Sequence, residues 1–148
     1  MPFRPNNSPW YLPGRKFGIG SKGVGIAAGS RKRILLVDDE VDALAILRIW
    51  LTELGFDISV AGNGSEALSQ VQEQLPDLIV TDQSMPRMTG LELCAQLRAR
   101  TRTRHIPIIM YSADPPQAAG GLYNRALPKS ASLRQLSDEI ASLLAAPG

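Results

Sequence analysis

Short runs of apolar residues alternate along most of the chain with longer stretches in which apolar residues recur every three or four positions. The short runs cover residues 33–38, 57–61, 77–82, 106–112 and, more weakly, 125–127. The run Ile34–Val37 contains no polar position, and such runs are typical of strands buried on both faces of a parallel sheet. We therefore predict five parallel strands joined by helices.

The longer stretches predict four helices, each with one apolar face. These faces consist of Leu44, Leu47, Leu51 and Leu54; Ala67, Leu68, Val71 and Leu75; Leu91, Leu93, Cys94 and Leu97; and Leu133, Leu136, Ile140, Leu143 and Leu144. Asn63 and Glu66 have the spacing of an N-terminal capping box. Ser132 and Gln135 have the same spacing before the last helix. The order of elements predicts an α/β fold with a doubly wound five-stranded parallel sheet.

The segment between the fourth and fifth strands, residues 113–124, differs from the other connections. It contains the pair Pro115 and Pro116 and the pair Gly120 and Gly121, which are poor helix formers. We therefore expect any helix in this segment, the fourth in the fold, to be shortened or disordered.

The composition is that of one globular domain, with 44% apolar and 20% charged residues in a chain of 148. No stretch approaches the roughly 20 apolar residues of a membrane span, and no apolar block resembles a secretory signal. We therefore expect a cytoplasmic protein. The single cysteine, Cys94, excludes an internal disulfide framework, and its place on an apolar helix face predicts a buried, unreactive thiol.

The charge is unevenly distributed along the chain. Residues 1–37 carry seven Lys or Arg and no acid, and removing these seven charges from the net +2 leaves −5 for residues 38–148. Residues 1–31 are also rich in Gly and Pro, so we expect a disordered basic tail before a domain at 32–146. A second basic run consists of Arg98, Arg100, Arg102 and Arg104 at a predicted helix end, and we interpret it as a solvated face.

Acidic residues follow two of the predicted strands. Asp38, Asp39 and Glu40 follow the first strand, and Asp82 follows the third. Because the carboxyl ends of parallel strands share one edge of the sheet, these acids should converge there and repel one another unless a cation, a proton or a phosphate is bound. The alternative is that Asp38 and Asp82 only cap the helices that follow them.

Four motifs occur in order at the ends of the first, third, fourth and fifth predicted strands: V-D-D-E at 37–40, D-x-x-M-P-x-x-x-G at 82–90, S-A at 112–113 and the late Lys129. Together they resemble the receiver domain of two-component response regulators over about residues 32–145. The resemblance implies a flavodoxin-like, CheY-like fold. It also implies a phosphoprotein that catalyses its own phosphorylation and dephosphorylation and is not a turnover enzyme.

By this resemblance Asp82 is the phospho-acceptor, and the donor is a sensor histidine kinase, a histidine phosphotransfer protein or a small phosphodonor. The resemblance implies a Mg²⁺ site formed by Asp38, Asp39, Asp82 and the backbone carbonyl of Ser84. It further implies that Ser112, Lys129 and the backbone N–H of Ala113 contact the phosphoryl group.

Two positions depart from the family pattern. Receivers usually have proline after the late lysine, whereas here Ser130 follows Lys129 and Pro128 precedes it, which leaves the direction of the lysine side chain open. Ala126 stands where receivers usually carry an aromatic residue, three positions before the lysine. We therefore expect the acidic residues that accept the phosphoryl group to be intact, and the segment through which receivers signal phosphorylation to a partner to be altered.

The chain ends at Gly148, directly after the last predicted helix, so we expect a single-domain regulator without a DNA-binding domain, either a monomer or a weak dimer. It would act through phosphorylation-dependent contact with an unknown downstream protein or as a phosphorelay intermediate. One alternative is a receiver-like scaffold that docks constitutively and does not switch. A more remote alternative is a phosphatase or phosphotransferase with an aspartyl nucleophile, because Asp38 and Glu40 have the spacing of its acid pair.

Overall fold

The structure is a computed structural model that describes residues 31–117 and 120–145. All but the last residue of the predicted basic tail, 1–31, lies outside the described residues, so that expectation stays a prediction. Among the described residues, no helix combines the length and the apolar content needed to cross a membrane.

The sheet has five strands, all paired in parallel. They are β2 (Arg33–Val37), β3 (Asp57–Ala61), β4 (Leu78–Thr81), β5 (Ile108–Ser112) and β6 (Arg125–Pro128), in the spatial order β3-β2-β4-β5-β6. The chain therefore moves from β2 to one side and then crosses to the other, and the reversal lies between β2 and β4. Ligands of such sheets bind at the carboxyl ends of the strands beside this reversal. The predicted doubly wound parallel sheet is confirmed.

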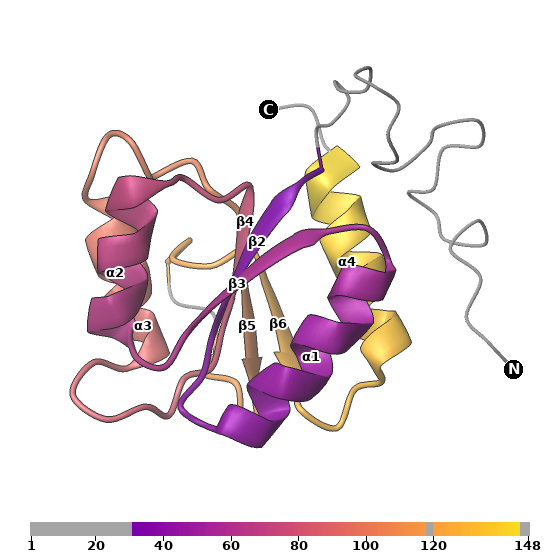
Figure 1. The fold of residues 1–148 in the computed structure, drawn as a ribbon. Coiled ribbons are helices and arrows are strands. Elements are labelled where there is room, and N and C mark those ends of the chain that lie inside the picture. The colour runs from indigo at the N-terminus through magenta and orange to yellow at the C-terminus, as the bar shows by residue number, and fades with distance from the viewer. Residues whose placement is uncertain (1–30, 118–119, 146–148) are drawn as a thin grey trace, which may run out of the picture.

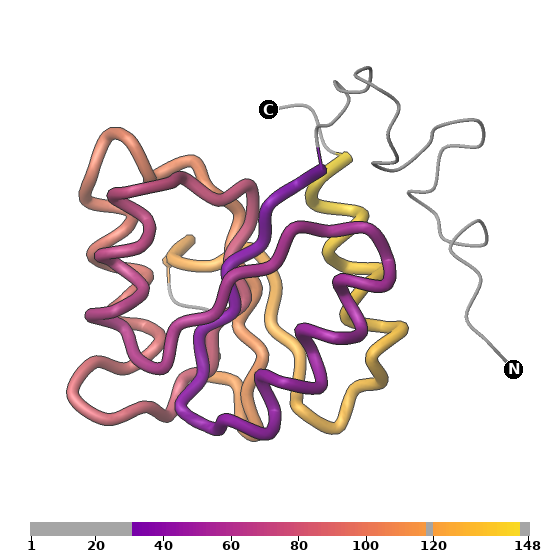
Figure 2. Tube along the Cα trace, in the orientation of Figure 1, coloured from indigo at the N-terminus to yellow at the C-terminus, as the bar shows by residue number. Residues whose placement is uncertain are grey.

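The helices cover both faces of the sheet, as Figure 1 shows. One face carries α1 (Val41–Glu53) and α4 (Leu133–Ala145), and the other carries α2 (Gly64–Glu73) and α3 (Gly90–Arg98). Each side buries an apolar core, with Leu51, Leu136 and Ile140 toward α1 and α4 and Leu93 and Leu97 toward α2 and α3. In Figure 2 the loops that follow β2, β4 and β6 all lie at the lower end of the sheet.

Two of the predicted helix caps are present. The Asn63 side chain accepts a hydrogen bond from the Glu66 N–H at 2.8 Å, and the Ser132 hydroxyl oxygen accepts one from the Gln135 N–H at 3.0 Å. A further capping box, not identified from the sequence, joins Thr89 and Glu92 at the start of α3. Each cap satisfies backbone N–H groups that a helix start leaves without partners, and so fixes where its helix begins.

The connection between β5 and β6 contains no helix among its described residues, 113–117 and 120–124, as the prolines and glycines predicted. Two side chains, Leu122 and Tyr123, pack against the core on the α2 and α3 side. The Tyr123 hydroxyl donates to the Pro116 carbonyl at 2.6 Å and closes the connection on itself. Ala126 pairs with the buried Met110 in β5 but is itself exposed.

The interpretation of the basic run as a solvated face is wrong for Arg98. Its guanidinium donates to the carbonyls of Leu122 (3.1 Å), Arg104 (2.9 Å) and Ile106 (2.7 Å) and to Asn124 Oδ1 (3.0 Å). Asn124 Oδ1 also accepts from the Ile108 N–H at 2.8 Å. Arg98 therefore joins the end of α3 to the start of β5 and to the β5–β6 connection.

Cys94 is completely buried on the inner face of α3, as predicted. Burial raises the pKa of its thiol to about 11, and the opposing effects of the Arg98 charge and a backbone hydrogen bond are smaller. Because the thiolate is the reactive form of cysteine, this thiol is unreactive near neutral pH.

Candidate functional site

The acidic site is formed where β2 and β4 end side by side. The Asp38 N–H donates to the Ala61 carbonyl at 3.1 Å, and the Asp82 N–H donates to the Val37 carbonyl at 2.9 Å. These bonds continue the parallel pairing by one residue and hold both carboxylates at the same edge. Asp38, Asp39 and Asp82 each contribute one carboxylate oxygen to a cluster whose atoms lie within 4.8 Å of one another. The prediction that these acids converge is confirmed.

Two of the three acids are withdrawn from solvent. Asp38 is 4% exposed and Asp82 8%, whereas Asp39 is exposed. Asp38 Oδ1 accepts from the Glu40 N–H at 3.0 Å, and Asp82 Oδ1 accepts from the Gln83 N–H at 2.8 Å. Each buried carboxylate therefore has one oxygen held by its own loop, which orients the other oxygen.

The alternative that Asp38 and Asp82 merely cap helices is wrong. The N-cap of α1 is Glu40, which makes no side-chain capping bond, and the N-cap of α3 is Thr89. The two aspartates stand before these positions, at the sheet edge.

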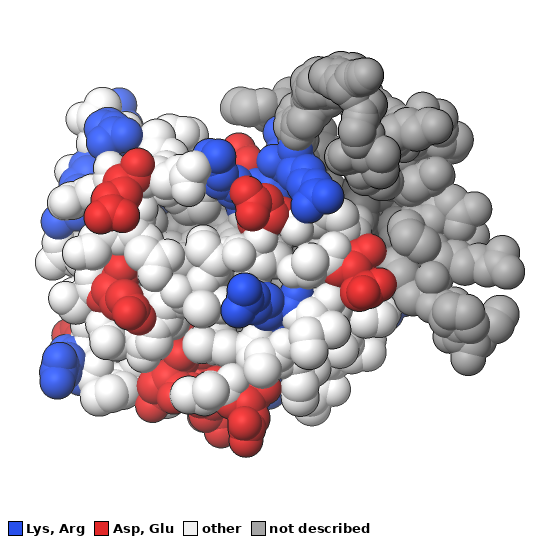
Figure 3. All heavy atoms as spheres, in the orientation of Figure 1, with Lys and Arg blue, Asp and Glu red and all other residues white. Residues whose placement is uncertain are grey.

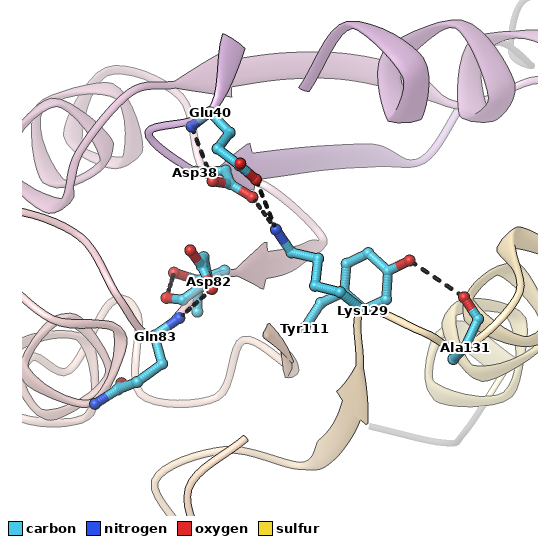
Figure 4. Close-up of polar contacts among 8 residues, drawn as sticks. Asp38, Glu40, Asp82, Gln83, Tyr111, Lys129 and Ala131 are labelled. Atoms are coloured by element: carbon cyan, nitrogen blue, oxygen red, sulfur yellow. Dashed lines mark hydrogen bonds and ion pairs between the residues drawn. The ribbon is translucent and has the colours of Figure 1, made fainter. Parts of the chain in front are cut away.

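Lys129 follows β6 and points into the acidic site (Figure 4). Its Nζ lies 2.6 Å from Asp38 Oδ2 and 3.7 Å from Glu40 Oε1. Burial alone would lower the pKa of Lys129, but the hydrogen bond and charge of Asp38, with the charges of Asp82 and Glu40, outweigh it and raise that pKa. The direction that the sequence left open is therefore toward the carboxylates, and the ammonium stays charged at neutral pH.

Tyr111, in β5, lies beside Lys129 and was not identified from the sequence. The Lys129 Nζ is 5.8 Å from the centroid of the Tyr111 ring, and the Tyr111 hydroxyl donates to the Ala131 carbonyl at 3.4 Å. Glu40 was expected among the acids, but its contact with Lys129 was not. The contacts of Lys129 with Tyr111 and with Glu40 join segments far apart in the sequence, so no local sequence pattern predicts them.

Ser112, Ala113 and Ser84 lie at the same edge of the sheet. Among the described residues, none of the three makes a side-chain hydrogen bond to the acids. Ser112 is buried at the end of β5, and its carbonyl accepts from the Lys129 N–H at 2.9 Å. Ala113 follows it and is exposed. Ser84 is exposed in the loop after Asp82.

The loop after Asp82 is fixed by its own hydrogen bonds. Gln83 accepts twice, through its carbonyl from the Gly90 N–H at 3.0 Å and through Oε1 from the Leu91 N–H at 2.8 Å. A Cβ at Gly90 would overlap the Asp82 carbonyl oxygen, so only glycine allows α3 to start this close to the strand end. Arg87, at φ 69°, takes a backbone conformation unusual for a residue with a side chain.

The site fits a divalent cation with a preference for oxygen ligands. Three carboxylates face one ammonium, so negative charge exceeds positive at the cluster. A cation among them would relieve the repulsion, and Mg²⁺ and Ca²⁺ are the ions that favour carboxylate oxygens. Figure 3 shows acidic side chains gathered at the lower edge of the molecule, where β2 leads into α1. Of the three clustered carboxylates, Asp39 is the exposed one.

Comparison with known proteins places this geometry in a family. The sequence model of the response regulator receiver domain matches residues 34–140. The DNA-binding response regulator MtrA of Mycolicibacterium smegmatis is 43% identical over 83 residues, which cover 56% of this chain and 35% of MtrA. The phosphate regulon transcriptional regulatory protein PhoB of Rhizobium meliloti is 41% identical over 81 residues, covering 55% of this chain and 36% of PhoB. The matched part therefore spans about a third of these relatives.

Solved structures agree with the sequence match. The response regulator TrrA of Thermotoga maritima, crystallised in complex with Mg²⁺ and BeF, superposes with a TM-score of 0.69 at 30% identity and covers 76% of this chain and 98% of TrrA. A response regulator receiver protein from Pseudomonas putida gives a TM-score of 0.70 at 26% identity, with 76% and 98% covered. With its fold, its acidic edge and its sequence match all in agreement, this chain belongs to the response regulator receiver domain family.

Proposed function

We propose that the domain accepts a phosphoryl group on Asp82. The observation that carries this proposal is the orientation of the buried Asp82 carboxylate, in which Oδ1 accepts from the Gln83 N–H at 2.8 Å. The loop thereby leaves Oδ2 as the oxygen for nucleophilic attack, at an edge that also carries Lys129. A positioned carboxylate is a competent nucleophile toward phosphorus when nearby positive charge offsets the repulsion between the reactants.

In the proposed step, a carboxylate oxygen of Asp82 forms a bond to phosphorus. The bond that breaks is the P–N bond of a phosphohistidine or the P–O bond of an acyl phosphate, and the leaving group keeps that electron pair. The product is an acyl phosphate on Asp82. Lys129 offers its ammonium to the phosphoryl oxygens, and Ser112 and the Ala113 N–H would donate hydrogen bonds to them.

Asp38, Asp39, Asp82 and the carbonyl of Ser84 would hold Mg²⁺. The carboxylate cluster and the TrrA complex with Mg²⁺ and BeF support this assignment. Bound there, the ion would supply positive charge that offsets the charge of the phosphoryl oxygens. Asp38 then has two cationic partners, because Lys129 Nζ already lies 2.6 Å from its Oδ2.

Membership of the family supports a sensor histidine kinase or a histidine phosphotransfer protein as the phosphoryl donor, and a downstream protein that recognises the phosphorylated state. The relatives named MtrA and PhoB are a DNA-binding and a transcriptional regulator. Because the match covers about a third of those proteins, we propose only the acceptor role for this chain.

The acceptor role is tested by incubating the protein with Mg²⁺ and acetyl phosphate and measuring its intact mass. We expect one phosphoryl adduct on the wild type and none on Asp82→Asn. Asp57→Asn is the matched control, because Asp57 is exposed at the amino end of β3, and it should keep the adduct. An adduct that persists in Asp82→Asn would refute the assignment. Phosphomonoester hydrolysis lost in Asp38→Asn but kept in Asp82→Asn would instead support the aspartyl phosphatase alternative.

A second candidate function is a receiver-like scaffold that does not switch. It is favoured by the absence of a helix among the described residues of the β5–β6 connection and by Ala126 in place of an aromatic residue. The test is to add beryllofluoride with Mg²⁺ and to follow backbone NMR shifts from Ser112 to Lys129. Large shifts would support switching, and binding without shifts would support the scaffold.

A further inference from the structure

The direction of Lys129 needs a structural cause, because Ser130 follows it where the family usually has proline. Its ammonium lies between two kinds of group (Figure 4). The carboxylates of Asp38 and Glu40 lie on one side, at 2.6 and 3.7 Å. The Tyr111 ring lies on the other, with its centroid 5.8 Å from Nζ.

The Tyr111 ring is itself held firmly. Tyr111 is 6% exposed and belongs to the core between the sheet and the α1–α4 layer. Its backbone pairs with Leu127 of β6, two residues before Lys129. Its hydroxyl donates to the carbonyl of Ala131, two residues after Lys129. Tyr111 therefore contacts the chain on both sides of the lysine as well as the lysine itself.

We propose that Tyr111 is a positioning residue for Lys129, with the ring face supporting the ammonium, whereas the long 3.4 Å bond of the hydroxyl contributes little. A cation within about 6 Å of an aromatic centroid is attracted by the negative face of the ring. The apolar edge of the ring also suits the methylene stem of a lysine whose head is in a polar site.

The ring differs from the carboxylates in one respect that matters for the acceptor chemistry. Asp38 and Glu40 compete with an incoming phosphoryl group for the ammonium, because all of them are anionic. The neutral ring does not, so it would keep Lys129 at the acidic edge when the carboxylate contacts are exchanged for phosphoryl oxygens. This kinetic consequence rests on the proposed function, whereas the positioning itself does not.

The test compares Tyr111→Phe, which keeps the ring and loses the hydroxyl, with Tyr111→Leu, which loses both. The first readout is the ring-current shift of the Lys129 Hε protons by NMR, which needs no phosphodonor. We expect this upfield shift in the wild type and in Tyr111→Phe, and its loss in Tyr111→Leu. An unchanged Hε shift in Tyr111→Leu would overturn the proposal.

The second readout is the rate of phosphorylation by acetyl phosphate with Mg²⁺. Tyr111→Leu should react about threefold to tenfold more slowly than wild type, the size expected for losing a partly buried cation–ring contact, and Tyr111→Phe should react within about twofold. In a Lys129→Ala background, Tyr111→Leu should have no further effect. An equal loss of rate in that background would assign the effect to general packing and would overturn the proposal.

Folding and function failures remain separable. Urea denaturation of each variant shows whether it is folded, and Tyr111→Met replaces Tyr111→Leu if the leucine variant is not. A wild type that forms no adduct contradicts the proposed function, yet the ring-current comparison still tests the role of Tyr111.

Discussion

Removing the Arg98 side chain is expected to release the connection between β5 and β6, which has no helix among its described residues to hold it. The guanidinium makes four hydrogen bonds, and those to the carbonyls of Leu122 and Ile106 are partly buried. Burial lowers the pKa of Arg98, although the group remains charged at neutral pH. In Arg98→Ala these carbonyls lose a charged donor, and Asn124 Oδ1 keeps the Ile108 N–H as its donor.

The magnitude follows from the two partly buried bonds. Hydrogen bonds to charged groups contribute about 1.5 to 3 kcal/mol each, and we take the lower end because the site is half open to water. The expected loss in the free energy of unfolding is therefore about 3 kcal/mol, a large share of the roughly 5 to 15 kcal/mol typical of a domain. With a urea m-value of about 1.5 kcal/mol/M, the midpoint should fall by about 2 M.

The assay is urea denaturation followed by circular dichroism, with hydrogen exchange of the Ile108 amide as a local readout. Arg100→Ala is the matched control, because Arg100 is half-buried like Arg98 but its one side-chain hydrogen bond to the described residues is long, 3.4 Å to Gln96. Its free energy of unfolding should change by less than about 0.5 kcal/mol. Arg98→Lys should recover only part of the loss, since an ammonium lacks the planar fork. A loss below about 0.5 kcal/mol in Arg98→Ala would refute the assigned role.

Three further outcomes are expected. Gly90→Ala should lose about 2 kcal/mol or more of unfolding free energy in urea, because the added methyl overlaps the Asp82 carbonyl oxygen. Gly62→Ala is the control and should lose little, because its methyl would meet only Glu66 Oε1, at 3.5 Å. Equal losses in the two variants would contradict this explanation. Thr89→Ala should cost about 1 kcal/mol in the same assay and Thr89→Ser far less, and a serine variant as weak as the alanine variant would argue against the capping box. The pKa of Cys94 is about 11 in the folded chain against an ordinary 9.0, so the unfolded chain loses this proton first. Unfolding free energy should therefore be highest below about pH 9 and fall by about 2 kcal/mol toward pH 11, with a smaller fall in Cys94→Ala; equal slopes for the two proteins would show that another group is responsible.

The strands and the acidic edge could be predicted because each depends on a local pattern. An apolar run such as Ile34–Val37 marks a buried strand wherever it lies, and an acid directly after it must stand at the carboxyl end. Asp38, Asp39 and Asp82 therefore converge as expected. The prolines and glycines at 115–121 likewise exclude a long helix through their own backbone chemistry.

The contacts that the sequence did not reveal join distant segments through groups without a distinctive pattern. Arg98 binds backbone carbonyls, which every residue has, and the partner Leu122 lies 24 positions away. Arginine in a basic run at a helix end is usually solvated, so composition favoured the wrong interpretation. Tyr111 and Glu40 meet Lys129 only once the sheet has brought their segments together.

The acidic edge draws on residues from both ends of the domain, since Asp38 and Lys129 are 91 positions apart. Its carboxylates come together only after β2 and β4 have paired, so a cation held by them would bind the folded chain and not the unfolded one. Such a ligand stabilises the fold by mass action, by about 2.7 kcal/mol at a concentration one hundred times its dissociation constant. The same acids repel one another when no cation is bound. Adding a divalent cation should therefore raise the free energy of unfolding and slow proteolysis of the chain.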